Sequence, residues 1–263
     1  MIKFFRKLRQ RLLTENKFSK YLLYALGEIL LVVIGILIAL SINNWNENSK
    51  NERLETNYLI RISKNLDNDF LEFDDAIKLA QERNNRVLFL QEALENPELV
   101  QDSSDYFVQS IITAGYTYIP VISNHSFEEL KSSGRLALIQ NEELRVLIAK
   151  YYDFVFGSSQ WDFLKEDVQL KYNEYSRGIL NQDQLNWVLN NYYSPDYLSN
   201  ISKTELDGIY QRFVSRKEFH SILPQVFEGK YNTMQVMHNS KRRAEYLKSE
   251  IQDELNGNSN LKK

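Results

Sequence analysis

The sequence contains no cysteine, which excludes a disulfide framework, a thiolate metal site and a cysteine nucleophile. Proline and glycine are also scarce, with four and nine residues in a chain of 263. Few chain breakers favour long helices. The three histidines, His125, His220 and His238, lie far apart, and no HxxxH or HExxH spacing brings metal ligands together. We therefore predict no metal and no cofactor.

Motifs of enzymatic chemistry are missing as well. The chain has no GxSxG nucleophile elbow, no GxGxxG turn and no GxxxxGK[ST] phosphate loop. The triplet DND at 67–69 resembles the start of a calcium loop, but Glu72 stands where that loop needs its glycine. Neighbouring acids such as Asp74 and Asp75 point to different faces of a helix. The sequence predicts no catalytic residue and no enzyme.

The near-neutral formal charge of −3 hides two oppositely charged regions. Residues 1–20 carry seven Lys and Arg side chains against one acid, a formal charge of +6. Beyond the apolar segment that follows, 25 basic residues face 33 acidic ones, a formal charge of −8. An acidic main domain argues against nucleic acid as a partner.

Residues 21–45 form the most apolar part of the chain and are predicted to be a transmembrane helix. From Tyr21 to Ile42 the only charged residue is Glu28, and a bilayer core of about 30 Å needs about 20 such residues. The basic residues before it place the N-terminus in the cytoplasm by the positive-inside rule, with Trp45 at the outer interface. This predicts a single-pass inner-membrane protein whose domain, residues 46–263, is periplasmic. A cleaved signal peptide ending near 39–41 is the alternative, but the basic region and the apolar run are both long for one.

Residues 1–20 form a basic arm with two interpretations. At 100° per residue Lys3, Arg6, Lys7 and Arg11 gather on one half of a helix and apolar side chains on the other. Such an amphipathic cytoplasmic arm would contact membrane lipid through its basic face. Alternatively, these charges only set the topology.

An acid inside the apolar segment also has two interpretations. Glu28, Gly35, Ala39 and Asn46 fall close to one line along the helix, and Gly35-x-x-x-Ala39 is a small-xxx-small spacing that lets helices approach closely. This face predicts packing against another membrane protein or against a second copy. In the simpler alternative the Glu28 carboxylate snorkels to the interface.

The external domain shows apolar steps of three and four that predict an antiparallel helical bundle. The longest helix begins near 50–54 and ends before Pro97, and the asparagines at 43–51 leave open whether it continues the membrane helix. A loop is expected at 96–105, then a short helix at 106–114 and an isolated connector at 117–122.

Capping signals place the later helices. Ser126 with Glu129 and Ser202 with Glu205 predict capping boxes, Asn141 predicts an N-cap, and Gly134 suits a left-handed C-terminal cap. The helices they delimit are expected at 142–156, 161–178, 204–222 and 225–255. Aromatic pairs such as 151–152 and 192–193 are expected in or near the core.

Two stretches, GEILLVVIGILIALSINNWNENSK and SFEELKSSGRLALIQNEELRVLIAKYY, resemble a family of bacterial single-pass membrane proteins whose domain has no known function. The resemblance covers nearly the whole chain and implies an uncleaved anchor, but it brings no activity, cofactor or catalytic residue. We therefore expect a non-enzymatic envelope protein whose domain binds a protein partner or assembles with itself. The alternatives are a sensor-like domain that binds a ligand between helices and acts through a membrane partner, and a hydrolase with a composite site.

Overall fold

The computed structural model of the chain describes residues 18–157, 167–191 and 201–260. In these ranges the regular structure is helical, and they hold no β-structure beyond an isolated bridge between Arg177 and Leu180. The chain divides into two compact units, Met1–Asn57 and Tyr58–Lys263. The predicted fold class is confirmed: an all-α chain with an apolar N-terminal helix followed in sequence by a helical domain.

The first helix of the described chain, α2, spans Phe18–Ala93. Its helical assignment runs without a break through the asparagine-rich stretch 43–51. Each asparagine lowers helix propensity by only about 0.7 kcal/mol relative to alanine, which a helix of this length tolerates. The helix ends before Pro97, as predicted.

The loop expected at 96–105 is wrong, because a short helix, α3, occupies Pro97–Asp102. Asn96 caps it by accepting the backbone N–H of Leu99, and Pro97 lies in its first turn, where a missing N–H costs nothing. Burial of Val100 then holds this turn against the domain. The next helix, α4, spans Ser104–Thr113, close to the expected range.

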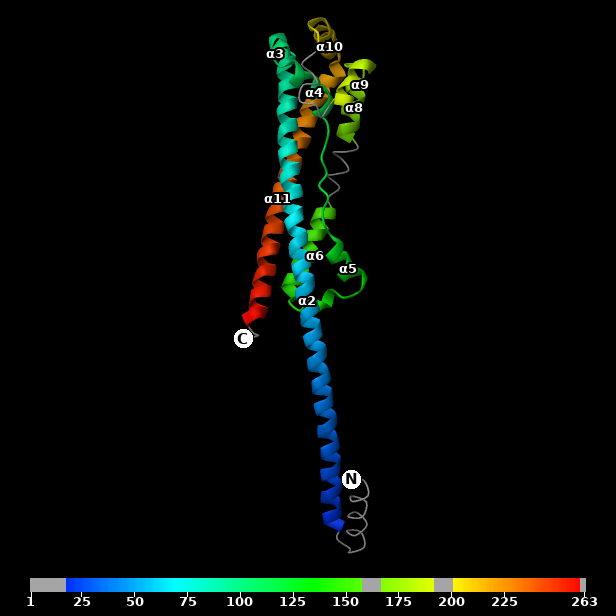
Figure 1. Cartoon of the computed structure of the whole chain (residues 1–263), viewed down its shortest axis with the longest axis vertical. Helices are drawn as coiled ribbons and strands as arrows, with labels where there is room; N and C mark the ends of the chain where they lie inside the picture. Colours follow the sequence, from blue (N-terminus) through cyan, green and yellow to red (C-terminus); the bar gives the residue numbers. More distant parts are fainter. Residues whose placement is uncertain (1–17, 158–166, 192–200, 261–263) are drawn as a thin grey trace. The chain divides into compact units, whose positions relative to one another are not determined.

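A segment without helix or strand, residues 115–124, joins α4 to α5 and is called the connector below. Figure 1 shows it as an extended green trace between the two helices. Helix α5 spans His125–Ser132, so the capping box predicted at Ser126 is wrong: Asn124 is the N-cap residue. Glu129 binds Tyr58 and Arg61 of α2 instead of the helix terminus.

The caps predicted at Gly134, after α5, and at Asn141, before α6, are confirmed. Gly134 has φ +68°, a left-handed conformation, ahead of the 3₁₀ turn η1, Leu136–Leu138. Helix α6 spans Glu142–Phe156, and Asn141 Oδ1 accepts the backbone N–H of Leu144 at its N-terminus.

Helices α8, Gln169–Ser176, and α9, Gln182–Asn191, follow α6. Helix α10 spans Lys203–Ser215 and begins with the predicted capping box of Ser202 and Glu205.

The boundary expected between residues 222 and 225 is wrong. Helix α10 ends at Ser215, and the last helix, α11, spans Lys217–Asn260 with Pro224 and Gly257 inside it. An interior proline costs about 3 kcal/mol. Burial of Phe219, Ile222 and Leu223 on the same helix offsets that cost, since each contributes about 1.5–3 kcal/mol.

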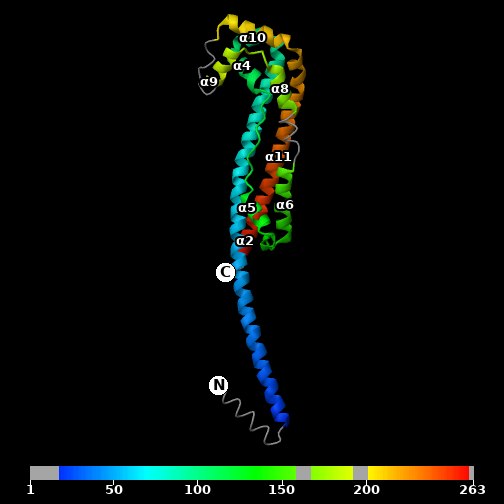
Figure 2. The ribbon, with the colours of Figure 1, turned by 90° about the vertical axis from the view of Figure 1, so that its right-hand side faces the viewer.

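Within the unit Tyr58–Lys263, α2 and α11 lie side by side and run antiparallel (Figures 1 and 2). Two ion pairs fix this direction, because Lys241 binds Asp74 while Lys248, further along α11, binds Asp67, earlier on α2. The antiparallel arrangement of the bundle agrees with the sequence-based expectation.

The unit has two separate apolar cores along these two helices. The α4–α10 core joins the end of α2 and the start of α11 to α4, α8, α9 and α10. The α5–α6 core joins the segment of α2 after Tyr58 and the last part of α11 to α5 and α6. Its members on α6 include the aromatic pair Tyr151 and Tyr152, which is buried as predicted; the pair at 192–193 lies outside the described residues.

Candidate functional site

The predicted membrane face lies on α2, where Glu28, Gly35, Ala39 and Asn46 share one helix. A Cβ placed on Gly35 would meet nothing within 4 Å, so no described part of the chain packs against this position. Gly35, Ala39 and Asn46 are exposed, whereas Glu28 is half-buried. The basic residues predicted to contact lipid, Lys3, Arg6, Lys7 and Arg11, lie outside the described residues.

The apolar stretch around this face is exposed throughout. Residues such as Leu31, Ile36 and Leu40 leave 70%, 55% and 52% of their surface open to solvent. This is the one helix of the described chain that is long and apolar enough to cross a membrane, and none of its apolar window is buried. Apolar area of this extent has no partner within the described residues, a property of lipid-facing surfaces.

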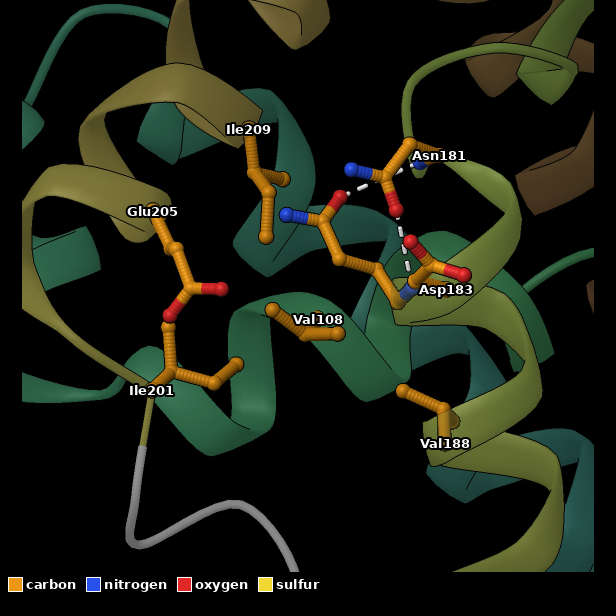
Figure 3. A pocket seen from close by; sticks show the side chains of 8 residues that line it. Val108, Asn181, Asp183, Val188, Ile201, Glu205 and Ile209 are labelled. Carbon is orange, nitrogen blue, oxygen red and sulfur yellow. Dashed lines mark hydrogen bonds between the residues drawn. The ribbon is translucent and has the colours of Figure 1, made fainter.

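In the other unit, a cavity of about 370 Å³ opens between α4, α9 and α10 (Figure 3). Its floor is apolar. Val108 of α4, Val188 of α9 and Ile209 of α10 form it together with Ile201, which lies just before α10. Four polar residues line the remainder: Asn181, Asp183, Gln184 and Glu205.

The polar lining comes from the N-termini of two helices. Asn181 Oδ1 accepts the backbone N–H of Gln184, and Gln184 Oε1 accepts that of Asn181, a reciprocal cap on α9. Glu205 plays the same part for Ser202 on α10. Arg212 Nη2 also donates to Gln184 Oε1 at 2.9 Å. The cavity therefore combines an apolar floor with a polar rim whose groups already stabilise helix ends.

The histidines do not assemble a metal site. His125 and His238 are exposed on α5 and α11, and His220 Nε2 lies 2.8 Å from the carbonyl oxygen of Phe213 among aromatic rings. In the ranges that the structure describes, no three side chains of His, Asp or Glu gather as ligands would.

Two buried ionisable residues of the domain were given no role by the sequence: Lys230 and Asp69, the latter noted only in the rejected calcium-loop triplet. Asp69 on α2 is completely buried and accepts the Ser123 N–H at 2.8 Å and the Tyr151 hydroxyl at 2.7 Å. Lys230 on α11 is 4% exposed and donates to Gly115 O at 3.2 Å and Thr117 Oγ1 at 2.7 Å.

Burial displaces both of their pKa values toward neutrality. Loss of solvation raises the pKa of Asp69 to about 6, although its two hydrogen bonds favour the charged form. Burial lowers the pKa of Lys230 to about 7, and the nearby Arg83 lowers it further. The sequence contains an indication of this burial. Both residues occupy positions where the three-and-four spacing of the helix places apolar side chains, as Asp69 does between Leu66 and Phe73 on α2.

Residues 28–181, more than half of the chain, match a protein family of unknown function, DUF6090. The match includes Glu28, the apolar stretch, the connector and α6. No curated protein and no solved structure matches the chain.

Proposed function

The chain belongs to the DUF6090 family of unknown function, and we propose that it is a non-enzymatic, single-pass protein of a bacterial inner membrane. Its anchor contacts another membrane protein or a second copy of the chain. Its acidic helical domain faces the periplasm and binds a protein partner or assembles with itself.

The observation that carries this proposal is the exposed apolar stretch of α2, which follows a basic N-terminal arm. The stretch is long enough to cross a bilayer core of about 30 Å. Residues 1–20 carry seven Lys and Arg side chains, against four in residues 46–65 on the other side of the stretch, and this excess favours an N-terminus in the cytoplasm. The same arm, through Lys3, Arg6, Lys7 and Arg11, is suited to anionic lipid at about 1 kcal/mol per charge.

Orientation is tested with reporters inserted into the otherwise complete chain, so that every variant keeps the anchor. A periplasm-active phosphatase inserted after Leu255 is expected to be active, and the same enzyme inserted after Glu15 is expected to be silent. As a matched control, a fluorescent protein that matures only in the cytoplasm should give the opposite pattern. An inactive but well-expressed phosphatase after Leu255 would reverse the proposed orientation.

The partner hypothesis predicts a periodic crosslinking pattern along the anchor. A photo-crosslinking residue at position 35 or 39, on the same face of the helix as Glu28, should capture one defined protein band. The same residue at Leu30 or Leu37 on the opposite face should capture lipid. In a membrane dimerisation assay, Glu28→Leu with Gly35→Leu should weaken self-association if the partner is a second copy, whereas Leu30→Ala should not. Capture of lipid alone at every position would refute the partner hypothesis.

The cavity between α4, α9 and α10 supports a second candidate, a ligand-binding sensor. Its size and its mixture of apolar floor and polar rim suit a small molecule. Filling the cavity with Ile201→Phe should release any small molecule retained by the full chain on extraction from its own membranes. Native mass spectrometry measures this, with Val214→Phe, an exposed position on α10, as the control. Wild-type chain that carries no such molecule would remove this candidate.

A further inference from the structure

The connector, residues 115–124, crosses from the α4–α10 core to the α5–α6 core without forming a helix or a strand. Backbone groups that lose contact with water need hydrogen-bond partners, and in an extended segment without a neighbouring strand side chains supply many of them. In the connector several of these partners are ionisable side chains of α2 and α11, so its attachment depends on their charge.

At its first end the connector is held by cationic side chains. Lys230 Nζ donates to Gly115 O and Thr117 Oγ1, and Arg83 Nη1 donates to Tyr116 O at 2.6 Å. The Thr117 N–H donates to Gln169 Oε1 of α8 at 3.1 Å.

At its second end the connector is held by two carboxylates one turn apart on α2. Glu72 Oε2 accepts the Tyr118 hydroxyl at 2.7 Å and the Val121 N–H at 3.0 Å. Asp69 accepts the Ser123 N–H, and Tyr152 donates from the other side to Ser123 O at 3.3 Å. The two ends therefore use buried groups of opposite charge.

Charged and titratable neighbours of these two buried groups come from each packed element. Arg83 of α2 faces Lys230, and the fully buried Tyr172 of α8 lies beside Gly115. Around Asp69 lie Glu72 on its own helix and two tyrosines of α6, Tyr151 and Tyr152. Burial raises the pKa of both tyrosines above 10, so they stay protonated around neutral pH.

We propose that the connector is a releasable strap between the two cores, and that its two attachments respond to pH in opposite directions. Release gives water access to Lys230 at one end and to Asp69 at the other. The Gly115–Thr117 attachment tightens as the pH rises above neutrality, and the attachment at Ser123 tightens as the pH falls below it.

The signs follow from proton linkage. In the attached state Lys230 has a pKa of about 7, against 10.5 for a solvated lysine, so the released state binds the extra proton between these values. Raising the pH through this window disfavours release. Asp69 has a pKa of about 6 when buried against 3.8 when solvated, so the attached state holds the extra proton. Lowering the pH through that window disfavours release at its end.

The test is amide hydrogen exchange of the full chain in detergent micelles, resolved to the Thr117, Val121 and Ser123 N–H groups. Protection is expressed against the intrinsic exchange rate of each amide at the same pH. We expect Thr117 protection to rise up to about 50-fold between about pH 7 and pH 9, and Ser123 protection to rise up to about tenfold between about pH 7 and pH 5.

Variants separate the two ends. Lys230→Met should abolish the alkaline rise at Thr117, and Asp69→Asn the acid rise at Ser123, each leaving the other end unchanged. Lys230→Arg keeps a cation at this position and should give low protection of Thr117 that does not vary with pH. This second variant tests the same end of the connector if Lys230→Met does not fold. Glu72→Gln is the matched control, because hydrogen bonds lower the pKa of Glu72 and keep it charged in this range. It should lower Val121 protection and leave the alkaline rise at Thr117 unchanged. Because the charge of Glu72 helps to raise the pKa of Asp69, the acid rise at Ser123 should persist but move to slightly lower pH.

Three results would overturn the proposal. The first is protection of Thr117 and Ser123 that does not change with pH. The second is a change of the same sign at both ends. The third is identical protection and pH dependence in the amides of α4 and α5, which would mean that exchange occurs by unfolding of the whole domain and not by release of the connector.

Discussion

Gly115, where the connector leaves α4, is the position at which the smallest possible side chain should be most damaging. A Cβ added there would lie 2.8 Å from Cε1 of Tyr172 and closer still to Cγ and Cδ1 of the same ring. These are rigid ring atoms of a fully buried side chain, not the end of a flexible one. The Tyr172 hydroxyl also donates to Ser110 O and Ile111 O at 3.0 Å each. Gly115→Ala must therefore displace a ring that is fixed at both ends.

The expected cost has two parts. Overpacking a well-filled core costs about 1–3 kcal/mol, and an unsatisfied buried hydroxyl adds about 1–3 kcal/mol, so the free energy of unfolding should fall by about 2–6 kcal/mol. Urea unfolding of the full chain in detergent, followed by far-UV circular dichroism, measures it as a shift in midpoint. Gly208→Ala on α10 is the matched control: its nearest contact would be an ordinary 3.5 Å, so the variant should be neutral or more stable by up to about 1 kcal/mol.

A double-mutant cycle isolates the contact. In the background Tyr172→Leu, which removes the ring, Gly115→Ala should cost less than about 1 kcal/mol. The difference between its costs in the two backgrounds, the coupling energy, should therefore be at least about 1 kcal/mol, whereas pairs without contact show almost none. If Gly115→Ala costs the same in both backgrounds, or nothing in the wild type, the close approach of Gly115 and Tyr172 is refuted.

Further predictions concern charge and capping. Because the pKa of Asp69 is raised to about 6 in the fold, its contribution to stability is present below about pH 4 and is lost as the pH rises to about 6. Wild-type chain should lose up to about 3 kcal/mol in unfolding free energy across that window relative to Asp69→Asn, and equal pH profiles would contradict the burial of Asp69. Asn141→Ala removes the cap of α6 and should cost about 1 kcal/mol by urea titration, whereas a loss below about 0.3 kcal/mol would show that the cap contributes little. Lys241→Met breaks an ion pair with the exposed carboxylate of Asp74 and should cost less than about 1 kcal/mol, diminishing in high salt.

The sequence predicted those features of the fold that depend on interactions between residues close together in the chain. The caps at Asn141 and Ser202 and the left-handed Gly134 depend on neighbours within four residues, and all three are confirmed. The apolar periodicity of α2 and α6 was equally visible. The missed helix α3 and the continuation of α11 through Pro224 depend on burial against distant elements, which outweighs local propensity.

The candidate sites show the same division. The exposed apolar stretch could be predicted because length and composition alone define it. The cavity residues Val108, Asn181 and Ile209 are separated in sequence by long intervals, and no spacing rule connects them. Ser126 was misjudged because its hydroxyl accepts from Asn65 of α2, a partner 61 residues away. Asp69 and Lys230 occupy positions where the helical spacing places apolar residues, but only the packing of the helices shows that they bind the connector.

Helix α11 has a consequence for which fragments of this chain can keep its two cores intact. It contributes to both cores of the unit Tyr58–Lys263, yet it lies entirely beyond residue 181, where the family match stops. Its fully buried side chains on the two cores include Phe219, Leu223, Met237, Leu247 and Ile251. At about 1.5–3 kcal/mol each, their burial contributes on the order of 10 kcal/mol, comparable with the whole stability of an ordinary domain. A fragment cut at the end of the family match would lose that contribution and expose both cores. The two cores of this chain therefore depend on residues beyond the family match, and a fragment that keeps both of them must extend through α11.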